Sequence, residues 1–138
     1  IAIEKVPLEK VSKYGIIGGK NLSDSVVQLS ELIEKPSSVE APSNLAIAGR
    51  YILTPEIFRA LEKTPRGKGN EIQLTDALQI VLKVEGIVGT IIEGKRYDIG
   101  NKMDFLKTTV EFALRRKEFA VEFKEFLIET LKLSGSQP

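Results

Sequence analysis

Residues 26–36 have the sequence VVQLSELIEKP, an apolar-rich stretch that ends at a proline. Residues 26–34 contain strand-like apolar positions, and Pro36 ends the pattern because it has no backbone N–H to donate to a neighbouring strand. Residues 35–43 form a loop by composition. The sequence therefore predicts a strand over 26–34, with further strands before and after it.

Those further strands differ in pattern. Residues 1–6 alternate apolar and polar side chains, as a half-buried strand does. Residues 14–17 form a short apolar strand that runs into a Gly18-Gly19 turn signal. Two more strands are predicted over residues 45–53 and 87–92.

Helices are predicted in the second half of the chain. Thr54 is a helix cap, and Pro55 at the first helical position opens a helix over about 55–63. Asn101 caps a later helix. The remaining helical segments are predicted over about 72–82, 101–117 and 119–132. Strands mixed with helices predict an α/β or α+β domain.

The composition is that of an ordinary globular domain. The chain has 138 residues, of which 42% are apolar and 28% charged, enough for one domain with a sizeable core. The net charge of +1 predicts no general attraction to nucleic acid or to an anionic membrane. No apolar run approaches the roughly 18 to 20 residues of a membrane span. Residues 1–6 resemble the middle of a strand, so we expect a piece of a longer chain.

Cysteine and histidine chemistry is excluded, because the sequence contains neither residue. Zinc sites of the usual Cys/His kind, thiol nucleophiles and histidine triads are therefore impossible. Any bound metal must be a hard cation held by carboxylates, such as Mg²⁺. The lack of cysteine fits a reducing compartment, and we expect the chain to be cytoplasmic.

Two charged motifs have alternative interpretations. Lys35 offers a mobile charge suited to a phosphate and Glu34 an acceptor for sugar hydroxyls, or the two are a solvated pair ahead of a proline. Strand alternation points these side chains to opposite faces unless the strand end twists. Asp98 precedes a helix start, where it either holds Mg²⁺ near a phosphate or satisfies backbone N–H groups in a turn.

Glycines and aromatic residues supply further candidates. Gly15 and Gly49 permit close approach of the backbone to a ligand, but such glycines also mark bulges. Residues 66–69 do not follow the phosphate-loop pattern and are interpreted as a surface loop before a helix start near Asn70 and Glu71. An apolar stripe at helical spacing is expected to belong to the core or to a subunit interface. It consists of Phe119, Phe123, Phe126, Leu127 and Leu131.

The order of these motifs resembles that of the bacterial UTP–glucose-1-phosphate uridylyltransferases, also called UDP-glucose pyrophosphorylases. The resemblance rests on YGII at 14–17, EKP at 34–36, APSNLAIAGRYIL at 41–53, KTP at 63–65, GNEIQLTDA at 69–77 and YDIGNK at 97–102. It covers nearly the whole chain in the right order. It implies an α/β nucleotidyltransferase fold, with a mixed sheet between flanking helices.

The implied enzyme joins UTP and α-D-glucose 1-phosphate to give UDP-glucose and pyrophosphate. The resemblance implies that Glu34 holds glucose hydroxyls and that Lys35 is the catalytic residue that binds the sugar phosphate. It also implies backbone contact from Gly15 and a sugar pocket lined by Ala48 and Gly49. Asp98 is implied as one of two acidic Mg²⁺ ligands.

One part of the family pattern is missing. The glycine-rich nucleotide-binding signature, of the form G-x-G-T-R, is absent, as is the acidic metal ligand of an early strand. We therefore expect residues 1–138 to be the C-terminal, sugar-phosphate-binding part of a single nucleotidyltransferase domain, with C-terminal helices at about 101–133. The N-terminal nucleotide-binding half is missing, and we expect this piece alone to be inactive.

Two alternatives stay open at this point. The shared Glu-Lys-Pro and Asp-x-Gly elements also fit a thymidylyltransferase acting on glucose 1-phosphate. The apolar stripe of the last helix also fits a non-catalytic assembly module, and we expect a homo-oligomer.

Overall fold

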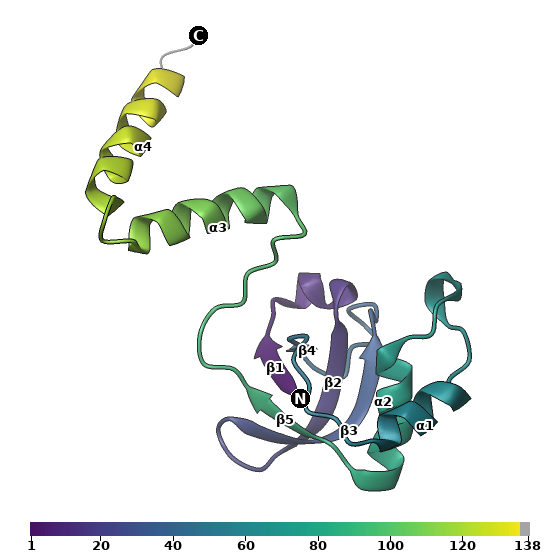
Figure 1. The fold of residues 1–138 in the computed structure, drawn as a ribbon. Helices are drawn as coiled ribbons and strands as arrows, with labels where there is room; N and C mark the ends of the chain where they lie inside the picture. Colours follow the sequence, from purple (N-terminus) through teal and green to yellow (C-terminus); the bar gives the residue numbers. More distant parts are fainter. Residues whose placement is uncertain (136–138) are drawn as a thin grey trace. The chain divides into compact units, whose positions relative to one another are not determined.

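The computed structural model describes residues 1–135, apart from the side chains of Lys68 and Ser134 (Figure 1). The chain divides into two compact units, Ile1–Gly94 and the part that begins at Lys95. Whether both belong to a single nucleotidyltransferase domain stays a prediction.

The first unit is built on a mixed sheet. Pairings follow the order β1-β4-β2-β3-β5, and β5 pairs back onto β1, so the sheet closes on itself. The β1–β5 pair is parallel, and the other pairs are antiparallel. The predicted mixed sheet is confirmed. The strands are β1 (Ala2–Lys5), β2 (Gly15–Asn21), β3 (Val26–Glu34), β4 (Leu45–Ile47) and β5 (Val88–Ile91).

Successive residues of β2 and β4 belong to two different cores. Ile16 and Ala46 pack with Val11 of the short 3₁₀ helix η1 (Leu8–Lys13). Ile17 and Ile47 belong instead to the larger cluster that includes the helices α1 and α2. Side chains alternate between the faces of a strand, so a strand covered on both faces has apolar residues in succession. This double cover explains the unbroken apolar stretches in the sequence.

Helices α1 (Glu56–Lys63) and α2 (Leu74–Glu85) pack together, and α2 lies against β3 (Figure 1). A 3₁₀ turn, η2 (Lys68–Asn70), lies between them. Two predicted details are wrong. Thr54 does not cap α1, because its hydroxyl donates to Glu85 and Pro55 takes the cap position. The second helix begins at Leu74 rather than at the predicted start near Asn70 and Glu71.

The predicted Gly18-Gly19 turn is wrong, since β2 continues through both glycines to Asn21. The register shifts between Gly18 and Gly19, which marks a bulge in the β2–β3 pair. Gly19 lies so close to β3 that a Cβ there would be 2.3 Å from the Gln28 carbonyl oxygen. Glycine at this position therefore permits close strand approach rather than chain reversal.

The strand predicted over 45–53 is also shorter than expected. β4 ends at Ile47, and Gly49 has a φ of 72°, which turns the chain out of the strand. Beyond this turn Ile52 is 97% exposed. Local apolar content predicted a strand here, but regular pairing with β1 and β2 ends at Ile47, after which Ala48 and Arg50 each make one backbone hydrogen bond with Ala2.

The second unit contains α3 (Lys102–Arg115) and α4 (Ala120–Ser134), which account for the helices predicted over 101–133. The predicted cap is confirmed, because the Asn101 side chain accepts hydrogen bonds from the N–H groups of Met103 and Asp104. None of residues 120–133 is buried, so the apolar stripe is not part of a buried core of this unit. Among the described residues, no helix is both long and apolar enough to cross a membrane.

Candidate functional site

Glu34 and Lys35 lie together at the end of β3. The Lys35 ammonium is 3.7 Å from Glu34 Oε1, with the side chains 46% and 19% exposed respectively. Lys35 has a φ of 47°, and its N–H donates to the Tyr14 carbonyl at 2.9 Å. This left-handed residue twists the strand end, so the two charges meet instead of pointing to opposite faces. The pair is solvent-accessible on the lysine side, so the ammonium is available to a phosphate.

The Glu34 carboxylate also contacts helix α2. Thr75, in the first turn of α2, donates its hydroxyl to Glu34 Oε2 at 2.5 Å. Gly15 pairs with Glu34 across the β2–β3 ladder. A Cβ on Gly15 would be 3.1 Å from Glu34 Oε2 and 3.2 Å from the Thr75 hydroxyl. The carboxylate is therefore enclosed by α2 on one side and by the bare backbone of β2 on another.

Ala48 and Gly49 directly follow β4, between Ile47, which lies near Gly15, and Tyr51, which feels the charge of Glu34. Ile47 Cδ1 would be 3.0 Å from a Cβ on Gly15, and the Glu34 charge acts on Tyr51. Ala48 is buried, whereas Gly49 is exposed, with open space where a Cβ would lie. The structure thus places Gly15, Glu34 and Lys35 in one cluster, with Ala48 and Gly49 on the adjoining segment.

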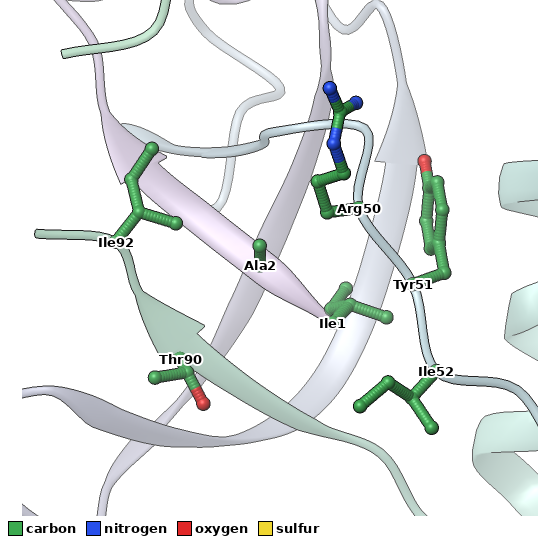
Figure 2. A pocket seen from close by; sticks show the side chains of 7 residues that line it. All are labelled: Ile1, Ala2, Arg50, Tyr51, Ile52, Thr90 and Ile92. Atoms are coloured by element: carbon green, nitrogen blue, oxygen red, sulfur yellow. The ribbon is translucent and has the colours of Figure 1, made fainter. Parts of the chain in front are cut away.

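Tyr51 connects this cluster to a cavity of about 300 Å³ (Figure 2). Burial raises the pKa of the Tyr51 phenol, and the negative charge of Glu34 raises it further. In Figure 2 the Tyr51 hydroxyl points away from Ile52. The cavity is lined by Ile1, Ala2, Arg50, Tyr51, Ile52, Thr90 and Ile92. Its walls are mostly apolar, so the charged cluster, rather than this cavity, has the chemistry for a sugar phosphate.

Asp98 belongs to the second unit and is exposed. Its Oδ1 accepts a hydrogen bond from the Gly100 N–H at 3.2 Å, as in the turn interpretation. The preceding segment is fixed to α3, because Tyr97 donates to Glu111 and accepts from Arg115, both at 2.8 Å. Within residues 1–135, no three carboxylates gather into a metal-binding group. A Mg²⁺ ion held by Asp98 would need its other ligands from elsewhere.

Thr75 and Tyr51 were missed as site residues by the sequence analysis. Thr75 lies three and seven residues before Leu78 and Leu82, on the inward face of α2. A hydroxyl on the buried face of a helix needs a hydrogen-bond partner, so the position of Thr75 in the helical pattern could have indicated a polar contact there. Tyr51 carried no such signal, because its proximity to Glu34 depends on how the chain folds after Ile47.

The motif order and the mixed sheet agree with the comparison to known proteins. The model of the family described as nucleotidyl transferase matches residues 1–114. The chain belongs to the nucleotidyl transferase family. Among the family members it resembles, the UTP–glucose-1-phosphate uridylyltransferase of Bacillus subtilis is 46% identical over 117 residues, which are 85% of this chain and 40% of that protein.

Solved nucleotidyl transferase structures agree with this similarity. A UDP-glucose pyrophosphorylase complexed with UDP-glucose matches with a TM-score of 0.81 and 46% identity, over 84% of this chain and 44% of that one. A UTP-bound enzyme from Acinetobacter baumannii matches with the same TM-score and 33% identity, over 94% and 44% of the two chains. The chain thus spans less than half the length of these relatives.

Proposed function

We propose that this chain is the sugar-phosphate-binding part of an enzyme that forms UDP-glucose and pyrophosphate from UTP and α-D-glucose 1-phosphate. The observation that carries the proposal is the Glu34–Lys35 pair, in a chain that is 46% identical over 117 residues to the Bacillus subtilis uridylyltransferase. Since the chain spans about 40% of that relative, the remaining parts of the active site would come from a longer polypeptide. Residues 1–138 alone are then inactive.

Each residue of the cluster has a role in this proposal. Glu34 accepts hydrogen bonds from glucose hydroxyls, and the Lys35 ammonium binds the sugar phosphate as the catalytic residue. Gly15 offers its backbone to the sugar. Ala48 and Gly49 line the sugar pocket, where the open space beside Gly49 leaves room for a ligand.

The reaction requires alignment and charge neutralisation rather than a base. An oxygen of the glucose 1-phosphate anion forms a bond to the α-phosphorus of UTP, and the bond from that phosphorus to the bridging oxygen of pyrophosphate breaks. The attacking oxygen is already ionised, so no histidine or cysteine has to remove a proton. Lys35 neutralises phosphate charge and holds the attacking group in place.

Asp98 is proposed as one of two acidic ligands of Mg²⁺, the second lying outside this chain. When bound, the ion supplies positive charge to the reacting phosphates. The attachment of Tyr97 to Glu111 and Arg115 fixes the segment immediately before Asp98. We further propose a cytoplasmic homo-oligomer, in which the apolar stripe of α4 forms a subunit interface.

The test is pyrophosphate release by the full-length natural protein, with Mg²⁺, glucose 1-phosphate and either UTP or dTTP. A strong preference for UTP is expected. A preference for dTTP would make the protein a thymidylyltransferase instead. Release with neither nucleotide would refute the enzyme proposal and favour a non-catalytic module.

Two substitutions test the assigned residues in that full-length protein. Lys35→Ala and Asp98→Ala are each expected to lower kcat/KM by about a hundredfold or more, because each removes charge stabilisation of the reacting phosphates. Lys132→Ala on the surface of α4 is the control and should keep its activity. Equal kcat/KM values in all three variants would remove both assignments.

A further inference from the structure

The hydroxyl of Thr75 has a different kind of partner from those of four other threonines that lie in a helix or directly after one. Thr64, Thr108, Thr109 and Thr130 each donate to the carbonyl oxygen four residues earlier. Thr75 instead donates to Glu34 Oε2, 41 positions away in the sequence. Thr75 is only 6% exposed and the bond is partly buried, and a hydrogen bond to a charged group is stronger where water is partly excluded.

This bond restricts the orientation of the Glu34 carboxylate. Oε2 is held by Thr75, while Oε1 lies 3.7 Å from the Lys35 ammonium. Rotation of the carboxylate would break the bond to Thr75. The absence of a side chain at Gly15 leaves space for the Glu34–Thr75 hydrogen bond, because a Cβ there would be in tight contact with both Glu34 Oε2 and the Thr75 hydroxyl. One carboxylate oxygen is therefore fixed internally, and the other is directed toward the lysine.

We propose that Thr75 is a positioning residue that orients the Glu34 carboxylate for recognition of the sugar hydroxyls. The inference rests on the proposed function, because it assumes that Glu34 binds the sugar of glucose 1-phosphate. A carboxylate that accepts hydrogen bonds from sugar hydroxyls binds the sugar more tightly when it already has the required orientation before the ligand binds. Thr75 supplies this preorganisation without touching the substrate.

The chain contains a matched control for the loss of a buried threonine hydroxyl. Thr64, which directly follows α1, is also 6% exposed, and its hydroxyl donates to the Ala60 carbonyl at 2.8 Å. Thr64→Val and Thr75→Val remove the same atom at equal burial. Only Thr75→Val removes a bond to Glu34. A loss of stability is therefore expected in both variants, whereas weaker sugar binding is expected in Thr75→Val alone.

The experiment measures KM for both substrates in the full-length protein. Thr75→Val is expected to raise KM for glucose 1-phosphate by about tenfold or more, the effect of losing a bond to a charged group. KM for UTP and kcat should stay within about twofold, since the loss concerns sugar binding alone. Thr75→Ser, which keeps the hydroxyl, should restore the wild-type KM. Thr64→Val should leave both KM values unchanged.

A further variant covers a failure of Thr75→Val to fold. Thr75→Cys keeps a small side chain with a weak S–H donor, so its KM for glucose 1-phosphate should lie between those of the wild type and the valine variant. A wild-type KM for glucose 1-phosphate in the valine or the cysteine variant would overturn the positioning role. An equal rise in KM for both substrates would overturn it as well.

The failure of the proposed function has a different signature. A wild-type protein that releases no pyrophosphate from UTP and glucose 1-phosphate refutes that function, and the Thr75 inference with it. An active wild type with an unaffected Thr75→Val variant refutes the Thr75 inference alone.

Discussion

Lys35 adopts a backbone conformation that residues other than glycine seldom adopt, with a φ of 47°. The conformation costs about 1 to 2 kcal/mol, and such strained residues concentrate at functional sites. Here the strain has a visible effect. It brings the Lys35 ammonium back to within 3.7 Å of Glu34, where a regular strand would have separated the two.

The pKa of the Tyr51 phenol depends on the charge of Glu34. Because Glu34 raises the pKa of the Tyr51 phenol, Glu34→Gln should lower that pKa, while burial keeps it above the ordinary value of 10.0. Ultraviolet absorbance titration measures the phenol directly, and Tyr51→Phe identifies its contribution. An unchanged titration midpoint in Glu34→Gln would show that the two groups are not close.

The same shift predicts a loss of stability at high pH. Above about pH 10 the phenol ionises in the unfolded chain but stays protonated in the folded one, so the folded state binds more protons. The contribution of Tyr51 is therefore complete below pH 10 and is lost as the pH rises through its raised pKa. Tyr51→Phe should show a weaker fall in urea midpoint over this range.

At the scale of the elements, the β2–β3 pair depends on Gly19. A Cβ there would lie 2.3 Å from a backbone oxygen of β3, which cannot move without breaking the ladder. Gly19→Ala should lower the free energy of unfolding by about 2 to 4 kcal/mol, as measured by urea denaturation.

Gly18→Ala is the control for this prediction. Its Cβ would meet side-chain atoms of Glu31 at 2.8 Å and Pro42 at 3.0 Å, and the glutamate chain is free to move aside. The cost should therefore be smaller than for Gly19→Ala. A larger cost at Gly18 would mean that the bulge does not have the register described for it.

Element boundaries that depend on a single nearby residue could be predicted from the sequence. β3 ends at Glu34, two residues before Pro36, as predicted, and α3 begins directly after the Asn101 cap. The course of β2 beyond Gly18 depends instead on its pairing with β3 across a bulge, and the early end of β4 depends on partner strands that lie far away in sequence. A run of apolar residues predicts burial, but pairing decides which of them form a strand.

In the candidate site, too, some features follow from the local motif and others depend on the fold. Glu34 and Lys35 could be predicted as candidates from the motif, but their meeting depends on the left-handed backbone of Lys35, since strand alternation alone would separate them. The Glu34–Thr75 bond joins residues 41 apart, and it forms only because α2 packs on β3. No local pattern specifies that contact. The roles of the site residues toward substrate and Mg²⁺ stay predictions.

At the scale of the whole molecule, the apolar face of α4 predicts self-association. Phe126 and Leu131 are 57% and 70% exposed, and the rings of Phe123 and Phe126 stack 6.2 Å apart. Burying such a face in a subunit interface would be favourable, whereas two added carboxylates would oppose it. Phe123→Asp combined with Phe126→Asp should reduce the oligomer mass in light scattering of the full-length protein.

A charge change on the opposite side of α4 is the control for that experiment. Lys132→Glu also adds negative charge but lies away from the stripe, so it should leave the mass unchanged. An unaltered mass in the double aspartate variant would remove the interface role of the stripe.

The closure of the sheet has a consequence for how the chain is made. β1 pairs in parallel with β5, with Ile3 opposite Ile91, so β1 remains without this partner until a strand almost ninety residues later in the sequence has been translated. Until then an edge of β1 and an edge of β3 are without their partner, and open edges recruit strands from other chains. The interval between translation of Glu34 and of Ile91 is therefore when nascent chains are most prone to aggregate.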